Sequence, residues 1–171
     1  MQMVKKILLI LVAAWVAFIL FMPKQNLYFK LEERLDKEDI HINETHIKEG
    51  LFNLKIDDAS IYIKGINLIQ IKNSTFFSLL FYSQVQLEEI RVDQSLSSMI
   101  PHKIQKILLT YTIISPQHLS LSGEGEFGRC KGDIDLVKHT IHLDFTELNT
   151  TKSLKSYLKK GEEGWYYETT F

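Results

Sequence analysis

The stretch from Ile7 to Met22 constrains this chain most, because it contains no charged or strongly polar residue. Lys5 and Lys6 precede it, and Pro23 follows it directly. As a helix it would be about 24 Å long, a little short of the roughly 30 Å hydrocarbon core of a bilayer, and apolar residues before the lysines lengthen it. We therefore expect a transmembrane helix, with the rest of the chain held beside a membrane.

A cleaved signal peptide is the alternative interpretation of this stretch. Cleavage requires small residues at the −3 and −1 positions, and the bulky Trp15 occupies −3 for cleavage after Ala17. An uncleaved signal-anchor is favoured, and the positive-inside rule places its amino terminus, with Lys5 and Lys6, in the cytoplasm. The residues expected to anchor the chain are Ile7, Leu11, Trp15, Phe18 and Met22.

The composition argues against nucleic acid as a partner. The 171 residues include Lys+Arg 20 and Asp+Glu 21, so no basic field exists to attract phosphates. Cys130 is the single cysteine and cannot form an internal disulfide. We expect it to be a small apolar strand residue rather than a reactive or intermolecular thiol.

The chain divides into three parts: residues 1–22 as the signal-anchor, residues 23–38 as a juxtamembrane amphipathic helix, and residues 39–171 as a β-rich domain. The helix is indicated by Leu27, Leu31 and Leu35, which are spaced by four among charged residues over 26–35. It could lie in the membrane interface, but its mixed charges favour packing against its own domain.

Apolar and polar residues alternate from Asp39 onwards, which is typical of half-buried strands. The alternating pairs are Ile40/Ile42, Leu54/Ile56, Ile61/Ile63, Ile69/Ile71, Val85/Leu87 and Ile90/Val92, with turn formers at Gly50, Asp57-Asp58, Gly65 and Asn73-Ser74. The predicted fold class is α+β, mainly an antiparallel β-sheet in a curved meander, with an N-terminal transmembrane helix and a few short helices.

Some segments depart from this alternation. Residues 76–82 are apolar on nearly all sides and are predicted to plug the core, either as a buried helical turn or as a covered strand. Residues 101–111 show helical spacing after Pro101, although a strand over 107–114 is an alternative. A short helix is predicted over 153–160, and a closing strand over 164–171.

The segment from Leu119 to Phe145 predicts three consecutive antiparallel strands, connected near Gly128-Arg129 and at 137–139. Glycine in a strand is costly and suggests a bend, a bulge or close backbone packing. A phosphate-binding glycine loop is the rival interpretation, but the P-loop lysine and the following helix are missing. The glycines concerned are Gly123, Gly125, Gly128 and Gly132.

No set of residues indicates a reaction. The six histidines lack the spacing of metal ligands, and Asp133 with Asp135 alternate with apolar residues as a solvated strand face does. No Ser-His-Asp or Cys-His arrangement with an elbow motif is present. We therefore expect no enzyme activity, no cofactor and no metal. Asn149 begins an Asn-x-Thr triplet, which matters only in a glycosylating compartment.

The layout resembles the type II secretion system protein N (GspN) family and its AsmA-like relatives. The resemblance rests on the short anchor, the amphipathic segment, the closing Gly164-Trp165-Tyr166-Tyr167 and above all the hairpin over 122–136. The hairpin residues that carry it are Gly123, Gly125, Phe127, Gly128, Gly132, Ile134, Asp135 and Leu136. The resemblance implies a single-pass inner-membrane protein with a periplasmic C-terminal domain and no catalytic residues.

Two functions follow from this resemblance as expectations. The first is an accessory component of a type II secretion or related pilus-type machine, which contacts other secretion or envelope proteins through a sheet edge or the strand faces around Phe127. The alternative is an AsmA-like lipid-binding or lipid-handling protein with an apolar β groove, lined by residues 76–82 and 104–111. In either case the N-terminal helix contacts the lipid bilayer.

Overall fold

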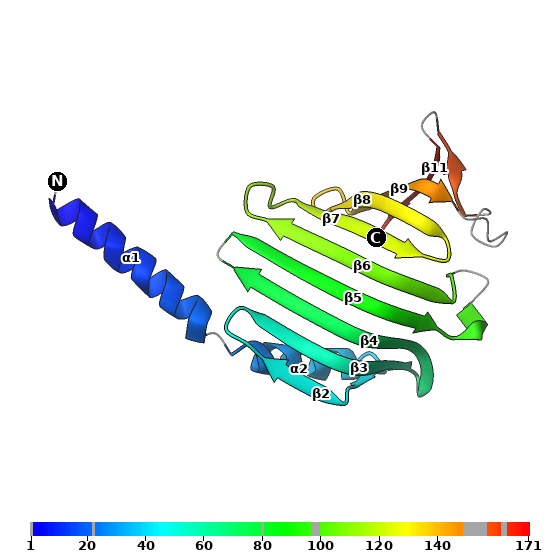
Figure 1. Ribbon diagram of the computed structural model, residues 1–171, viewed down its shortest axis with the longest axis horizontal. Helices are drawn as coiled ribbons and strands as arrows, with labels where there is room; N and C mark the ends of the chain where they lie inside the picture. The colour runs from blue at the N-terminus through cyan, green and yellow to red at the C-terminus, as the bar shows by residue number, and fades with distance from the viewer. Residues whose placement is uncertain (1, 22, 80, 97–99, 149–156, 162–163) are drawn as a thin grey trace.

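The computed structural model describes residues 2–21, 23–79, 81–96, 100–148, 157–161 and 164–171. It consists of two helices followed by one large antiparallel sheet (Figure 1). The helices are α1 (Gln2–Phe21) and α2 (Lys24–Asp36), and a short 3-10 helix, η1, covers Gln94–Leu96. The strands are β1 (Ile40–Asn43), β2 (His46–Glu49), β3 (Asn53–Ile63), β4 (Ile66–Leu79), β5 (Tyr82–Val92), β6 (Lys103–Thr112), β7 (His118–Gly125), β8 (Gly128–Asp135), β9 (Thr140–Leu148), β10 (Lys159–Lys160) and β11 (Trp165–Thr170).

The strands from β3 to β9 follow one another as a simple meander, which confirms the predicted fold class apart from its membrane-spanning part. The order in the sheet is β1-β3-β4-β5-β6-β7-β8-β9-β11-β10, and β2 pairs with the other half of β3. Every pairing is antiparallel. The alternating side chains of neighbouring strands therefore fall into cross-strand rows.

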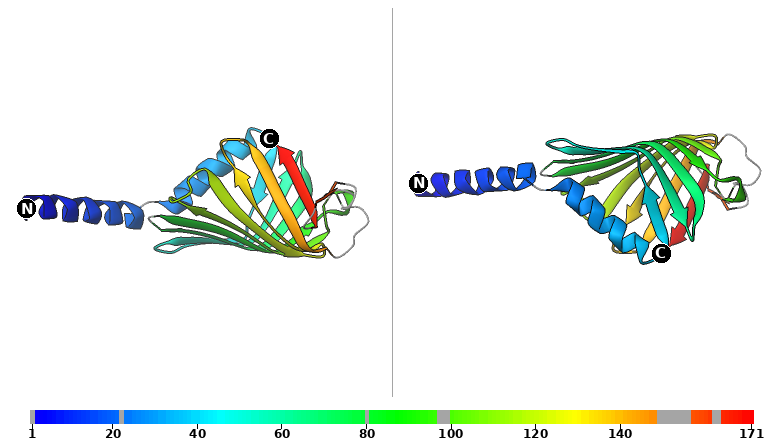
Figure 2. Two further views of the ribbon diagram at one scale, coloured as in Figure 1. Left: turned by 90° about the horizontal axis from the view of Figure 1, so that it is seen from above. Right: turned by 90° about the horizontal axis from the view of Figure 1, so that it is seen from below.

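Helix α1 is an apolar helix that stands apart from the sheet (Figures 1 and 2). Its large apolar side chains from Met3 to Val16 are between 37 % and 77 % exposed. Among the residues that the structure describes, no helix has both the length and the apolar character needed to cross a membrane. The predicted anchor residues Ile7, Leu11 and Trp15 lie on α1, whereas Met22 and the side chain of Phe18 lie outside the described residues.

The sheet is strongly curved, so that α2 and the strands β9 and β11 lie on the same side of its central strands (Figure 2). A row of irregularities crosses four adjacent strands. In a regular strand, successive residues that face the same side are two positions apart. Along β3 to β6, one pair of successive inner-face residues in each strand is three positions apart: Ile56/Ala59, Ser74/Ile71, Leu87/Ile90 and Ile107/Ile104. Asp58 and Glu89 have positive φ in this row, of 53° and 52°. The pairing of β6 with β7 contains a bulge, because its register shifts between Ile104 and Lys106. A bulge bends its strand and increases the local twist, which contributes to the curvature.

Helix α2 packs against β1, β2 and β3, which confirms that the amphipathic segment lies on its own domain. The backbone N–H of Lys24 donates a 3.0 Å hydrogen bond to Oε1 of Glu49, so the first residue of α2 is held at the end of β2. The buried residue of the helix is Tyr28, whereas the predicted stripe residues Leu27 and Leu31 stay about half exposed. The helix thus covers one part of the sheet without sealing it.

Several predicted elements are wrong. Residues 101–111 contain strand β6 and no helix, as the strand alternative had it. Residues 76–82 do not plug the core: β4 ends at Leu79, β5 begins at Tyr82, and Phe81 between them is 60 % exposed. Asp57-Asp58 and Asn73-Ser74 lie inside β3 and β4 rather than in turns.

The hairpin strands over 119–145 and the closing strand are confirmed as β7, β8, β9 and β11. The first hairpin turn consists of Glu126 and Phe127, two residues before the predicted position, because Gly128 already pairs with Gly125. Of the helix predicted over 153–160, residues 153–156 lie outside the described residues, and Lys159–Lys160 form the short strand β10.

Candidate functional site: the apolar inner face

The inner face is the side of the sheet on which α2 lies, and it is almost entirely apolar. Its cross-strand rows run through Leu54, Phe76, Val85, Leu109, Leu121 and Leu143, then Ile56, Ser74, Leu87, Ile107, Gly123, Cys130 and Phe145, and finally Ala59, Ile71, Ile90 and Ile104. Several members are buried and form one hydrophobic cluster with Tyr28 and Phe127. Ser74 is a buried polar residue in these rows.

A first cavity, the α2 cavity, lies between α2 and the inner face and measures about 330 Å³. Leu27, Tyr28 and Leu31 form its helix side. Its sheet side is formed by the start of β3, the end of β4 and the start of β5, including Leu54, Phe76 and Val85. The cavity is therefore a largely apolar space at one end of the strands, close to the residue at which α2 begins.

Tyr28 anchors the helix over this cavity. Its side chain is 8 % exposed, and its hydroxyl oxygen is buried near the carboxylate of Glu44. Burial raises the pKa of Tyr28 far above its ordinary value, and the nearby carboxylates of Glu44 and Glu32 raise it further. The hydroxyl thus stays protonated, and the ring acts as a packing group.

A second cavity, the Phe127 cavity, lies on the inner face over β6 to β9 and measures about 200 Å³. It is apolar and is lined by residues that include Ile107, Leu121, Phe127 and Phe145. The rings of Phe127 and Phe145 meet edge to face with their centroids 5.9 Å apart. Leu109 pairs with Val85 on one side and Leu121 on the other, so one row of apolar side chains links the two cavities.

The glycines of the β7–β8 hairpin make room for Phe127. A Cβ on Gly123 would stand 2.9 Å from Sγ of Cys130 and 3.3 Å from Cζ of Phe127. Phe127 therefore folds back over β7 and is buried. The glycines serve close packing, which was one of the predicted reasons for their presence.

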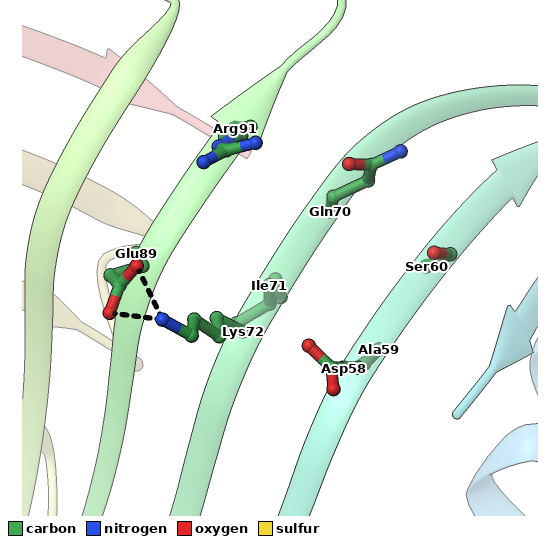
Figure 3. Close-up of a pocket in the computed structure, with 8 residues that line it drawn as sticks. All are labelled: Asp58, Ala59, Ser60, Gln70, Ile71, Lys72, Glu89 and Arg91. Carbon is green, nitrogen blue, oxygen red and sulfur yellow. Dashed lines mark hydrogen bonds and ion pairs between the residues drawn. The ribbon is translucent and has the colours of Figure 1, made fainter. Parts of the chain in front are cut away.

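The outer face is polar and carries a cavity of about 390 Å³ beside Asp58 and Glu89 (Figure 3). Its lining includes Asp58, Lys72, Glu89 and Arg91. Lys72 Nζ lies 3.0 Å from Oε1 of Glu89, and both side chains are more than half exposed. A solvated ion pair of this kind contributes little energy and offers no enclosed environment for chemistry.

The remaining predicted site residues fall into different environments. Asp133 is exposed on the outer face, whereas Asp135 is buried and accepts hydrogen bonds from the backbone N–H groups of Val137 and Lys138, each at 2.9 Å. The Lys138 N–H, followed by that of Val137, holds the pKa of Asp135 below its ordinary value. Ile134 is partly buried and Leu136 is exposed in the turn that Asp135 caps.

Cys130 lies buried against Gly123 and lines the Phe127 cavity, as a small apolar strand residue should. Burial raises the pKa of its thiol. Within the described part of the chain, no group of three or more His, Cys, Asp or Glu residues could hold a metal ion. Asn149 lies outside the described residues.

Sequence reasoning missed the residues that define this site. Tyr28 is absent from the predicted stripe, and Leu109 falls in a segment predicted as a helix, with a strand over 107–114 as the alternative. The cross-strand register supplies the missing signal, because it shows which residue of each apolar pair faces inward. Comparison with protein families, with curated proteins and with solved structures finds no match for this chain. The resemblance to the GspN family therefore stays a prediction.

Proposed function

We propose that this protein binds the hydrocarbon chains of lipids on the inner face of its sheet while α1 attaches it to a membrane. The observation that carries the proposal is the unbroken apolar row that links the α2 cavity to the Phe127 cavity. An acyl chain needs a long apolar surface without hydrogen-bonding groups to satisfy, and this row offers that surface across successive strands.

The exposure of α1 supports the membrane part of the proposal. Large apolar side chains that are exposed along a helix are more stable in the hydrocarbon of a bilayer than in water. In this arrangement the amino terminus with Lys5 and Lys6 is cytoplasmic and the sheet lies across the membrane, as the positive-inside rule predicts. The resemblance to the GspN family implies that this compartment is the periplasm.

Scaffolding within a secretion or pilus-type machine is less well supported by this site. That hypothesis relied in part on the strand faces around Phe127, and the ring of Phe127 is buried against Gly123 and Gly125. A role among secretion or envelope-assembly proteins stays a prediction, and lipid binding is the function that the geometry favours.

The test is photochemical labelling of the full chain in vesicles that contain a phospholipid with a diazirine on its acyl chain. Peptide mapping by mass spectrometry then reports which segments contact the chain. We expect labelling of inner-face peptides from β5, β6 and β7 in addition to α1. Labelling confined to α1 would contradict the proposal, and α1 serves as the internal reference for insertion.

A matched pair of variants sharpens this test. Leu109 faces inward between Val85 and Leu121, whereas its neighbour Leu108 faces outward between Gln86 and Ser122. Leu109→Asn should reduce labelling of the sheet several-fold and leave that of α1 unchanged, because it places an amide in the apolar row. Leu108→Asn should leave both unchanged. Circular dichroism of both variants checks that the sheet is retained.

A further inference from the structure

The two ends of the strands differ in chemistry. We name the end at which α2 begins the near end; it comprises Gly50–Phe52, the β4–β5 turn with Phe81, residues 113–117 and residues 136–139. The far end comprises residues 37–39, Lys64-Gly65, the described residues between β5 and β6, and Glu126-Phe127. The antiparallel pairings fix these two groups, because each hairpin turn alternates from one end to the other.

The near end exposes apolar side chains on four separate turns. Ile114 is 93 % exposed, and its companions with more than a third of their surface exposed are Leu51, Leu79, Phe81, Tyr82, Ile113, Leu136, Val137 and Phe171. These turns are tied together along the sheet: the N–H of Ile113 donates to the carbonyl of Phe81 at 3.0 Å, and the N–H of Leu136 donates to the carbonyl of Gln117 at 2.8 Å. Together they form a continuous apolar rim.

The far end has the opposite character. Its connections and the adjoining strand β10 carry Lys37, Glu38, Asp39, Lys64, Asp93, Glu126, Lys159 and Lys160, whereas the near-end turns carry the single charge of Lys138. Exposed large apolar residues at the far end of the described sheet are fewer, namely Ile66, Ile100 and Tyr157. The exposed apolar turn residues are thus concentrated at the near end, as expected for a surface that contacts an apolar environment.

Helix α1 leaves from this same end. The backbone of Lys24 is bonded to Glu49, one residue before the β2–β3 turn, so the chain that leads back to α1 starts among the near-end turns. Figure 1 shows α1 beyond the strand ends where the β4–β5 and β6–β7 turns lie. A membrane that holds α1 would therefore face the near end of the sheet.

We infer that the near-end rim inserts into the interface of a lipid bilayer and forms a membrane-contact site separate from α1. Apolar side chains on adjacent turns fit the interfacial region, where they leave water without requiring hydrogen-bond partners. The near absence of charge at the rim lowers the cost of this insertion, whereas insertion of the far end would have to remove charges of both signs from water. The inference does not rest on lipid binding by the inner face.

Contact of the rim with a bilayer would also bring the α2 cavity close to lipid. Lys24, Phe52, Phe77 and Ser78, which belong to or adjoin the near-end elements, line the cavity. Docking of the rim would place the cavity at the bilayer surface, so that an acyl chain could pass between the bilayer and the inner face without crossing water.

The experiment places an environment-sensitive NBD fluorophore on single cysteines of the full chain in vesicles. The background variant is Cys130→Ala, and the labelled sites are Ile114→Cys at the near end and Ile66→Cys, also well exposed at 61 %, at the far end. The vesicles contain equal parts of phosphatidylethanolamine and phosphatidylglycerol, with a doxyl-labelled phospholipid as quencher. Quenching at position 114 should exceed quenching at position 66 several-fold.

A third site, Val137→Cys, tests whether the whole rim is inserted, and it should behave like position 114. Equal quenching at positions 114 and 66, or quenching at neither, would overturn the inference. If the acyl-chain probe labels β6 but the fluorophore at position 114 is in water, lipid binding by the inner face is supported and insertion of the rim is contradicted. If the rim is quenched but β6 is not labelled, insertion of the rim is supported and lipid binding by the inner face is contradicted.

Discussion

A Cβ placed on Gly125 would stand 2.8 Å from Cε1 of Phe127 and 3.1 Å from the backbone oxygen of Lys103. The first contact involves the edge of a ring, whereas the second involves a neighbouring strand. Gly132 is more tightly placed, because a Cβ there would overlap the carbonyl oxygen of His142 on β9. The hairpin glycines therefore differ in whether the neighbouring atoms could move to make room for a Cβ.

Alanine at these positions should destabilise the sheet to different extents. For Gly125→Ala we expect a loss of about 1–3 kcal/mol in the free energy of unfolding, since the Phe127 ring can tilt away. Gly132→Ala should cost more than this, because the backbone of β9 must move and the β8–β9 hydrogen bonds must distort. Urea unfolding followed by circular dichroism measures both.

Gly65→Ala is the control for the loss of glycine itself. Gly65 has a φ of +79° and no atom within 4 Å of its Cβ position, so only backbone strain of about 1 kcal/mol is expected. A Gly132→Ala variant as stable as Gly65→Ala would show that β8 and β9 are not packed as closely as described.

The thiol of Cys130 should be unreactive in the folded protein. It is buried beside Gly123, and burial raises its pKa, so both access and thiolate fraction are reduced. Ellman's reagent at pH 8 should react with it only after denaturation, whereas the exposed thiol of the variant Ile114→Cys should react at once. Rapid reaction of Cys130 in the folded chain would mean that the Phe127 cavity admits polar reagents.

The turn between β8 and β9 should depend on pH through Asp135. Its folded-state pKa is lowered by the N–H groups of Lys138 and Val137, so the carboxylate adds stability at pH values above the ordinary Asp pKa of about 3.9. This stability is lost as the pH falls through the folded-state value. Asp135→Asn should therefore lower the urea midpoint at pH 7, and its difference from the unchanged protein should shrink below about pH 4.

Asp133→Asn is the matched control for this titration, because Asp133 lies on the same strand with about half of its side chain exposed. Its midpoint at pH 7 should stay close to that of the unchanged protein. A pH-independent effect of Asp135→Asn would show that the hydrogen bonds, rather than the charge of the carboxylate, hold the turn.

Local pattern alone predicted the meander, the amphipathic helix and the closing strand, because period-two alternation and glycine turns are read directly from neighbouring residues. It failed for β6. Ile104, Ile107, Leu108 and Tyr111 have helical spacing, yet the register shifts between Ile104 and Lys106. This shift turns a two-residue step into a three-residue one, and Leu108 then faces outward.

The same physical cause misplaced two predicted turns. Asp58 has a positive φ inside β3, and acidic residues at such positions look like turn formers in a sequence. Ser74 occupies the inner face between Ile56 and Leu87, where a polar residue is not expected. The curvature and the inner face depend on pairing between distant strands, and no short window of sequence contains that information.

The last prediction separates two roles within α2. Tyr28 is buried, so Tyr28→Ala should lower the free energy of unfolding by about 3–5 kcal/mol through loss of packing. Leu31 lines the same cavity but is 50 % exposed, so Leu31→Ala should cost far less stability. If an acyl chain fills the cavity, Leu31→Ala should nevertheless reduce photolabelling of the sheet, because the chain loses a contact on its helix side. Unchanged labelling in Leu31→Ala would mean that α2 only braces β1–β3 and that bound lipid, if present, lies over the Phe127 cavity.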